Sequence, residues 1–392
     1  MMSPRAQRAL LLVAACVLGV LEFFRHETAP AIARAVIPAS SFPSVDSRLA
    51  LKDRGELPVP PGTPAAHASN LLAMPASHRC VVVAFWFAGE RESAPDVQIA
   101  SSCFERARQL WTPATFVLNR HEISGKLGYG IRRLGNPVAW LDETGRIHLF
   151  VVATGPGGWA ASRILHVRQT DVAADSDNPV FNEPRVLPLA WSWNVSHLVR
   201  GSPLALEDGG MVLPAYFELG VKYPLALRFD AAGELRGMTR ISDRRAILQP
   251  TLIALNAGHW LALMRDNRIE GKIAVAQTGD GGTTWRDLRD LNLANPDASI
   301  SATTVGPWHF FLAHNSSLKS RKVLDLSESA NGVDWVRMQT LATGESFSDG
   351  GKTKAAEFSY PATVWADSSL WVSYTENRTR IAWQRFVVEK SP

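Results

Sequence analysis

The sequence is poor in several residue types and motifs that mark common classes of function. Its 392 residues include three cysteines, and no group of Cys, His, Asp or Glu has the spacing of a metal site. No glycine-rich phosphate loop is present. The formal net charge is only +4, and the basic residues are scattered instead of forming a patch. We therefore expect no cofactor, no metal ion and no nucleic-acid partner.

Helical periodicity is also scarce. Beyond the first 24 residues no long segment repeats its apolar positions every 3.6 residues, so few helices are expected. What recurs six times is a polar or glycine-containing turn leading into a strand rich in aromatic and β-branched residues. These strands are predicted at 81–87, 147–153, 211–217, 260–264, 310–314 and 370–374. Further strand candidates follow at 97–101, 164–169, 225–229, 273–278, 323–327 and 381–388. The spacing suits four-stranded repeats in an all-β fold.

The N-terminus has a different character. Arg5 and Arg8 precede an apolar run from Ala9 to Phe24, which predicts a signal peptide or membrane anchor over residues 1–35. Residues 36–64 are rich in Pro and Ser and suit a tether or an extended segment packed along the fold. Either N-terminal form places residues 65–392 outside the cytoplasm, in a bacterial periplasm or anchored and facing it. Cys80 and Cys103 would then lie in an oxidising space on adjacent strands, and the sequence leaves open whether they are bridged.

The most informative motif spans Thr278 to Trp285, with the pattern [ST]xDxGxTW. Asp280 can accept hydrogen bonds from the backbone N–H groups that follow it, and Gly282 allows a left-handed turn. The pattern resembles the Asp box of sialidase-like proteins, which by that resemblance stabilises a hairpin on a propeller rim. Residues 327–335 are interpreted as an eroded second copy with one insertion.

Over roughly residues 60–390 the chain resembles the sialidase (neuraminidase) superfamily, in particular bacterial BNR-repeat proteins. The resemblance rests on ordered segments that begin FAGERESAPDVQI at 87, VLPAYFE at 212, LQP at 248, LMR at 263, HNS at 314 and FSYP at 358. It implies one six-bladed β-propeller with its ligand site at the central axis.

The resemblance also implies roles for residues in these segments. Asp96 matches the acid/base aspartate and Tyr360 the tyrosine nucleophile. A tyrosine suits a sugar whose anomeric carbon carries a carboxylate, because an anionic nucleophile would be repelled. The implied substrate-binding residues are Arg91, Arg265, Arg321, Gln249, Tyr216 and Glu218, where arginines would hold a carboxylate by paired hydrogen bonds.

Two positions depart from the family pattern. His67 stands where sialidases have an arginine, and Gln249 stands where they have the glutamate that activates the tyrosine. A glutamine cannot accept that proton, so His67 is the predicted base. Its ordinary pKa near 6.5 predicts activity that depends on deprotonation in the neutral range.

The sequence therefore predicts an extracytoplasmic glycosidase acting on an acidic oligosaccharide or polysaccharide, with Asp96, Tyr360 and His67 as catalytic residues. Two alternatives remain open. A His and Tyr pair could serve a lyase on uronate-containing polysaccharide, and the two departures could mark a propeller that binds carbohydrate without catalysis.

Overall fold

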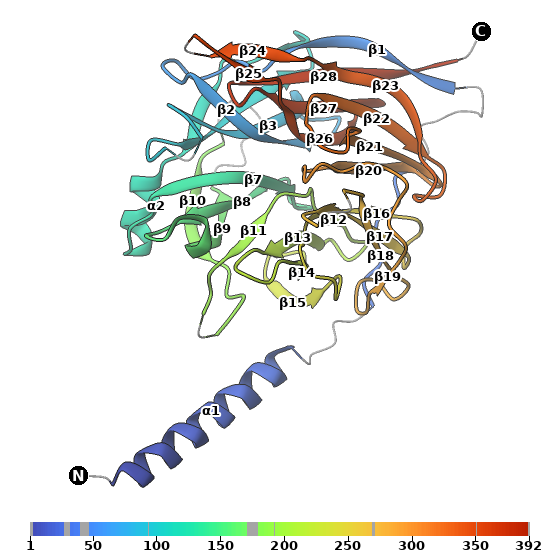
Figure 1. Ribbon diagram of the computed structural model, residues 1–392. Coiled ribbons are helices and arrows are strands. Elements are labelled where there is room, and N and C mark those ends of the chain that lie inside the picture. The colour runs from blue at the N-terminus through green and yellow to red at the C-terminus, as the bar shows by residue number, and fades with distance from the viewer. Residues whose placement is uncertain are drawn as a thin grey trace.

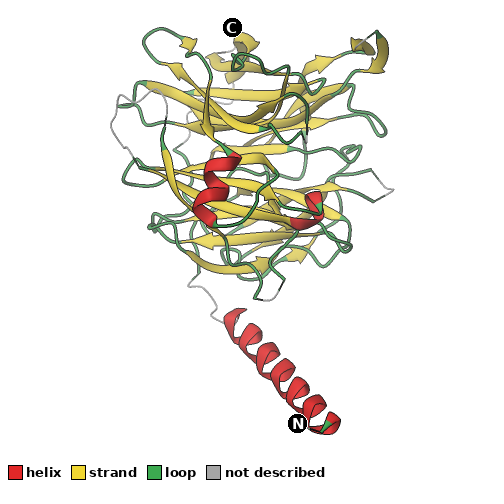
Figure 2. Ribbon diagram, turned by 90° about the vertical axis from the view of Figure 1, so that its left-hand side faces the viewer, coloured by secondary structure: helices red, strands yellow, loops and turns green. Residues whose placement is uncertain are grey.

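A computed structural model describes residues 3–26, 32–39, 47–92, 94–170, 179–191, 193–268, 271–349 and 351–390. Strands form most of the body, and helix α1 (Pro4–His26) projects away from it (Figures 1 and 2). Within the described residues no helix is both long and apolar enough to cross a membrane. Cys16, on α1, is exposed and not bridged.

The strands of the described residues form six sheets of four or five strands. The sheets are numbered in chain order, and the strands of each sheet are given from the innermost to the outermost. The first contains β2 (Ala65–Ala73), β3 (Cys80–Gly89), β4 (Gln98–Glu105) and β5 (Leu110–Trp111), and β6 (Thr115–Leu118) also pairs with β4. The second contains β7 (Arg133–Leu141), β8 (Ile147–Thr154), β9 (Ser162–Gln169) and β10 (Phe181–Val186). The third contains β11 (His197–Val199), β13 (Met211–Phe217), β14 (Tyr223–Phe229) and β15 (Leu235–Arg240), with β12 (Leu204–Ala205) beside β13.

The remaining sheets follow the same order. The fourth contains β16 (Ile247–Ala254), β17 (Trp260–Asp266), β18 (Ala274–Thr278) and β19 (Arg286–Asp287). The fifth contains β20 (Ser301–Gly306), β21 (His309–Asn315), β22 (Val323–Ser329) and β23 (Val336–Thr343). The sixth contains β26 (Phe358–Ala366), β27 (Ser369–Glu376), β28 (Arg380–Lys390) and β1 (Ser47–Glu56). A hairpin of β24 (Ser346–Asp349) and β25 (Lys352–Ala355) joins the fifth sheet to the sixth.

The inner strands close a ring. Contacts run from β2 to β7 and from β7 to β11, pass within the third sheet from β11 to β13, and continue from β13 through β16, β20 and β26 back to β2. The molecule is thus the six-bladed β-propeller that the sequence predicts. The six predicted aromatic strands are the second strands of the six sheets, and the further candidates are the third strands.

The N-terminal part of the chain joins the propeller earlier than residue 65. Strand β1 pairs antiparallel with β28 and completes the sixth sheet, so the first and last strands of the fold lie side by side (Figure 1). Upstream, Ala33 and Ala35 are buried, and Ala35 donates to the Ala257 carbonyl at 2.8 Å. The segment 36–64, predicted as a tether, thus contains a strand of the propeller. The charged stretch KDRGE (52–56) of this strand does not have the apolar pattern from which a strand would be predicted.

Helix α2 (Arg120–Leu127) and the 3₁₀ turn η1 (Gly158–Ala161) lie between strands (Figure 2). The sequence conceals α2 because only Ile123 of its eight residues is buried, so no apolar stripe marks it. Its ends carry ordinary caps: Asn119 accepts from the His121 N–H and Gly128 adopts a left-handed conformation.

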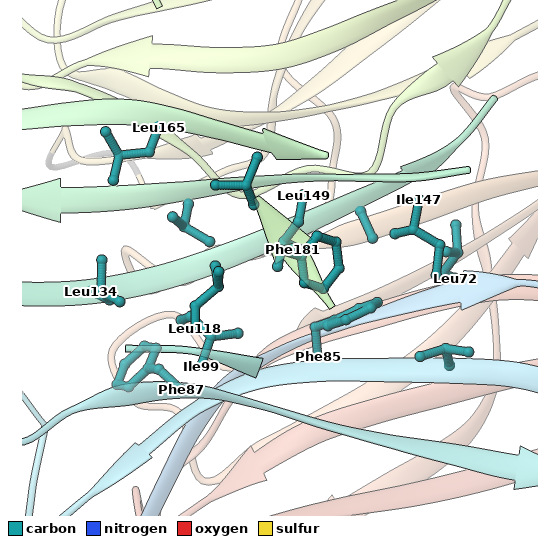
Figure 3. Packing of buried hydrophobic residues seen from close by; sticks show 14 of the residues in the cluster. Leu72, Phe85, Phe87, Ile99, Leu118, Leu134, Ile147, Leu149, Leu165 and Phe181 are labelled. Carbon is teal, nitrogen blue, oxygen red and sulfur yellow. The ribbon is translucent and has the colours of Figure 1, made fainter. Parts of the chain in front are cut away.

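The core lies between adjacent sheets. Figure 3 shows Phe85 and Ile99 of the first sheet packed toward Leu149 and Phe181 of the second. The rings of Phe85 and Phe181 are 6.1 Å apart and nearly perpendicular, a favourable arrangement for aromatic pairs. Each sheet buries both faces in this way, which explains why the second strands read as continuous apolar runs.

Cys80 and Cys103 form a disulfide that links β3 to β4. The bridge settles the question that the sequence leaves open. Disulfides persist in oxidising compartments, so the bond is compatible with an extracytoplasmic location.

The Asp box has the expected hydrogen bonds. Asp280 accepts from the Thr284 N–H at 2.8 Å and from the hydroxyls of Thr284 and Thr278 at 2.6 and 2.7 Å. Trp285 donates from its indole N–H to the Gly282 carbonyl at 3.1 Å and packs against the core between the third and fourth sheets.

The second box is one residue shorter than the first, not longer. Its serine is Ser329, which accepts from the Asn331 and Gly332 N–H groups, and Asn331 takes the place of the aspartate. Trp335 repeats the indole bond to the Gly332 carbonyl at 3.0 Å. The sequence interpretation began two residues too early, at Ser327, and so introduced an insertion.

We predict that Asp280→Ala lowers the free energy of unfolding by about 2 kcal/mol, because it removes three hydrogen bonds to a charged acceptor. Urea denaturation measures the loss. Asp334→Ala in the second box is the matched control. Within the described part of the chain the only hydrogen bond to its carboxylate comes from the Asn331 side chain, on the surface, so the change should be well under half as large. Equal losses in the two variants would contradict the role given to Asp280.

We also predict that stability falls as the pH drops below about 6.5. Five histidines of the described chain are buried and have lowered pKa values, mainly because burial disfavours the charged ring: His67, His148, His166, His197 and His314. Below the unfolded-state pKa the unfolded chain binds protons that the folded chain does not, so stability decreases with falling pH. Each histidine contributes a slope of up to about 1.4 kcal/mol per pH unit.

The test is the pH dependence of unfolding between pH 7 and 5 for His197→Gln, since burial lowers the pKa of His197 to about 4. The slope should become shallower by up to the contribution of one proton. His121→Gln, at an exposed position of α2, is the control and should leave the slope unchanged. An unchanged slope in His197→Gln would show that the pKa of this ring is the same in the folded and the unfolded protein.

Candidate active site at the propeller axis

The inner strands share a local distortion near the axis. In β2, β7, β16 and β26 one extra residue forms a β-bulge, and a residue of each bulge adopts a left-handed conformation: Ala68, Asn136, Gln249 and Tyr360, with φ between 43° and 53°. Such a conformation is costly for residues other than glycine and concentrates at functional sites. Three of the four residues line one cavity, so the bulges direct side chains toward the axis.

We call this the axial cavity; its volume is about 170 Å³. It is lined by Phe87, Glu92, Asn136, Trp159, Leu198, Tyr216, Glu218, Gln249, Arg265 and Tyr360. The first, second, third, fourth and sixth sheets and their loops all contribute. Of the predicted residues, Tyr216, Glu218, Gln249, Arg265 and Tyr360 lie here together.

Arg200 lies beside Tyr360, where the inner strand of the third sheet is broken between β11 and β12. It is 3% exposed, and its guanidinium lies 5.3 Å from the centre of the Tyr360 ring. It donates to the carbonyls of Tyr360 and Pro361 at 2.7 Å each and to that of Ser69 at 3.1 Å. Burial lowers the pKa of Arg200 to about 10, so it remains charged at neutral pH. All its hydrogen-bond partners among the described residues are neutral carbonyls, so its charge is not balanced by a carboxylate.

Gln249 holds two other side chains of the cavity. Its oxygen accepts from Arg265 at 3.1 Å and its nitrogen donates to the Tyr216 hydroxyl at 3.2 Å. Burial raises the pKa of Tyr216 well above its usual value, so that hydroxyl stays neutral. Gln249 therefore positions Arg265 and Tyr216 and makes no hydrogen bond to Tyr360 in the described structure.

The arginines near the cavity are paired with carboxylates. Arg265 contacts Asp297 at 2.7 Å, and Arg321 contacts Glu357 at 3.1 Å. Arg378, on the turn between β27 and β28, contacts Glu357 at 2.9 Å and also pairs with Glu92.

These ion pairs change the pKa values of the residues that form them. Burial would raise the pKa of Glu357, but Arg378 and Arg321 outweigh it and lower that pKa to about 2. Burial would lower the pKa of Arg265, yet its interactions with Tyr360 and Asp297 raise it. Both groups are therefore ionised at neutral pH.

His67 touches Tyr360 but does not line the cavity. The two rings are 4.5 Å apart, and His67 Nε2 lies 3.9 Å from Glu92 Oε1. His67 is 2% exposed, and neither ring nitrogen has a hydrogen-bond partner in the described part of the chain. Burial and the nearby Arg378 lower its pKa to about 3. The expected titration of His67 in the neutral range is therefore wrong, because that expectation assumed a solvated ring.

Glu218 has the opposite shift. It follows the last residue of β13 and its side chain is partly buried, and this burial raises its pKa against the opposing effects of Lys222 and Arg265. A carboxyl group with a raised pKa at a cavity wall is suited to act as a general acid.

Asp96, Arg91 and Arg321 lie elsewhere. Asp96 is exposed, and its carboxylate accepts from the Glu90 N–H at 2.7 Å, so it holds the loop after β3 and lines neither cavity described here. Arg91 lines a second, larger cavity. Arg321 stands behind the wall of the axial cavity and donates to the Asp297 carbonyl at 2.5 Å.

The sequence motifs assign no role to Asn136, Glu92, Arg378, Arg200 or Trp159. A signal for Asn136 exists: Asn136, Gln249 and Tyr360 are each followed by proline, at the same place in an inner strand. Proline lacks the N–H that a sheet interior requires and is tolerated at bulges. Arg378 and Glu92 lie on turns, where nothing local in the sequence shows that they meet.

Comparisons with known proteins agree with this geometry. The sequence matches the family described as the BNR repeat-like domain over residues 81–372. The fold is similar to that of the Hadza microbial sialidase Hz136, with a TM-score of 0.65 and 16% identity, covering 82% of this chain and 65% of that one. Trypanosoma rangeli sialidase is similar with a TM-score of 0.64 and 12% identity, covering 87% and 60%.

A protein of unknown function from Dyadobacter fermentans is similar along its whole length, with a TM-score of 0.65 and 11% identity, covering 88% of this chain and 100% of that one. The chain spans 65% and 60% of the two sialidases, and at these identities the likeness shows the fold alone. The search of curated proteins finds no match. Because the family match covers most of the chain, the protein belongs to the BNR repeat-like domain family and has a sialidase-like six-bladed β-propeller.

Proposed function

We propose that this protein is an extracytoplasmic glycoside hydrolase that binds an acidic sugar of an oligosaccharide in the axial cavity. The observation that carries the proposal is that Tyr360, Arg265 and Glu218, whose pKa is raised by burial, line one cavity beside the uncompensated charge of Arg200. The disulfide supports the location, since such bonds persist in oxidising compartments.

The positive charge of Arg200 makes an anionic ligand favourable here. Arg265, Arg321 and Arg378 are already paired with Asp297, Glu357 and Glu92, so they contribute little net charge. The surplus comes from Arg200, whose charge is poorly screened because it is buried. Arg265 reaches the cavity itself and is the residue that would bind the ligand carboxylate, with Arg321 supporting Asp297 behind it.

The proposed reaction proceeds through a covalent intermediate. The Tyr360 oxygen attacks the anomeric carbon, the glycosidic bond breaks, and Glu218 gives its proton to the leaving oxygen. The phenol proton passes to Glu92, whose carboxylate lines the same cavity and lies 3.9 Å from His67 beside Tyr360. A water oxygen then bonds to the anomeric carbon as the bond between Tyr360 and the sugar breaks. Glu218 accepts a proton from the water, and Glu92 returns its proton to the Tyr360 oxygen.

The positions of these groups in the ring suit a displacement. Tyr360 and Glu92 belong to the sixth and first sheets, and Glu218 and Arg265 to the third and fourth. In a closed ring of six these pairs of sheets lie on opposite sides of the axis. Nucleophile and acid would thus approach a bound sugar from opposite sides.

A second candidate is a propeller that binds the sugar without cleaving it. Gln249 favours it, because this side chain is fully engaged with Arg265 and Tyr216 and cannot take a proton. The lyase alternative has less support, since a buried His67 outside the cavity lining cannot reach a proton on the substrate.

We predict that Glu218→Gln slows hydrolysis of a natural acidic oligosaccharide by about 10²- to 10⁴-fold, the usual contribution of a general acid. With an aryl glycoside of the same acidic sugar, whose leaving group needs no proton, the rate should change by less than tenfold. Rates on a panel of sialic acid and uronic acid glycosides measure both effects. Asp96→Asn is the control and should keep its rate. Loss of rate in Asp96→Asn alone would return the acid role to that residue.

Gln249→Glu separates the hydrolase from the binding-only candidate. If Glu92 is the base, Gln249→Glu should change the rate less than about threefold, whereas Glu92→Gln should lower it by about 10²-fold or more. Tyr360→Phe should abolish turnover and leave affinity for the acidic sugar within a few fold, as isothermal calorimetry can show. If the native protein shows no hydrolysis and Gln249→Glu does, the native protein binds the sugar without cleaving it.

A further inference from the structure

A second cavity, which we call the outer cavity, lies next to the axial one. Its volume is about 460 Å³, within the range of about 300–1,000 Å³ usual for small-molecule sites. Its walls come from the start of β2, the loop after β3, the β24–β25 hairpin and the turn between β27 and β28. Glu92 lines both cavities, so the two share a wall.

The charged groups of the outer cavity balance. Its acidic residues are Glu90, Glu92 and Glu357, and its basic residues are Arg91, Lys354 and Arg378. An anion or cation therefore gains no net electrostatic attraction here. A sugar hydroxyl, which both donates and accepts hydrogen bonds, can use both kinds of group.

An aromatic side chain completes the site. Phe347 of β24 lines the outer cavity and is half-buried, so part of its ring remains open. Asn377, whose oxygen accepts from the Glu357 N–H at 3.0 Å, adds an amide beside it. An apolar surface with a few fixed polar groups is the composition expected of a ligand site.

The position of the outer cavity decides which part of a glycan reaches it. It lies between the sixth and first sheets, on the side of Tyr360 and Glu92. The leaving group departs toward Glu218, on the side of the third and fourth sheets. A unit in the outer cavity must therefore be attached to the reacting sugar at a position other than the scissile linkage.

We propose that the outer cavity binds a neutral, hydroxyl-rich unit attached to the acidic sugar on its non-leaving side, with Phe347 against its ring and Arg91 and Glu92 hydrogen bonding to its hydroxyls. This inference rests on the proposed function. Its consequence is that the protein recognises an acidic sugar within a chain, or one with a neutral side chain, in preference to a bare acidic monosaccharide.

The test is calorimetric binding to full-length Tyr360→Phe, which cannot turn over. The probes are glucuronic acid, and the two disaccharides of glucuronic acid and N-acetylglucosamine that differ only in their order. We expect the disaccharide with N-acetylglucosamine on the non-reducing side to bind at least tenfold tighter than glucuronic acid. Adding Phe347→Ala should remove that gain and leave glucuronic acid binding unchanged, and Arg91→Gln should reduce it. The controls Phe116→Ala and Arg289→Gln, at exposed positions outside both cavities, should change nothing.

N-acetylneuraminic acid provides a second arm, because its neutral glycerol chain can enter the same cavity. Phe347→Ala should weaken the binding of N-acetylneuraminic acid. It should not weaken the binding of the analogue whose glycerol chain has been shortened by periodate oxidation. The inference is overturned if an acidic sugar binds and Phe347→Ala affects no probe, or if the reverse disaccharide shows the gain. If no acidic sugar binds, or if Arg265→Gln leaves binding unchanged, the proposed function itself fails and the outer-cavity assignment fails with it.

Discussion

The contact of Arg200 with the Tyr360–Pro361 bulge is the interaction on which the arrangement of the site depends. One guanidinium from the third sheet donates to three carbonyls of the sixth and first sheets. The next residue, Gly201, has no room for a side chain, because a Cβ atom there would lie 2.2 Å from the Pro250 carbonyl of the fourth sheet. The break in the third sheet thus fits against the bulges of three other sheets. A tyrosine with a left-handed backbone conformation is retained only where several surrounding contacts hold it in place, as the contacts with Arg200 do for Tyr360.

This arrangement couples the fold to the electrostatics of the cavity. Because Arg200 donates its hydrogen bonds to carbonyls, it stabilises the backbone without giving up its charge. Arg265, Arg321 and Arg378 are instead neutralised by carboxylates that also fix their positions. The cavity therefore has a modest net charge and well-placed donors, in contrast to an open cluster of arginines. A site of this kind selects a ligand by geometry as much as by charge, which suits a sugar with one acid group among many hydroxyls.

The sequence predicts the fold well because the strands that carry its pattern are buried on both faces. The second and third strands of each sheet are dense in apolar residues, and the Asp box supplies a local turn whose hydrogen bonds involve neighbours in sequence. Strand β1 and helix α2 escape prediction because neither buries a continuous apolar face. Ordered motifs likewise bring Gln249, Arg265 and Tyr360 to one cavity, since each lies on or beside an inner strand whose place the fold determines.

The remaining site residues could not be derived in this way, and the reason is physical. Whether Asp96 or Glu92 faces the cavity depends on the path of one short loop. In this loop Asp96 accepts a hydrogen bond from the Glu90 N–H, and Glu92 forms an ion pair with Arg378, which is distant in the sequence. The pKa of His67 depends on complete burial beside a cation, which no local pattern reveals. Substitution of the family arginine by His67 then has a consequence that motif comparison misses. A neutral ring fills the space next to Tyr360. The positive charge near Tyr360 comes instead from Arg200, which is attached to a different sheet and is directed at the backbone of Tyr360.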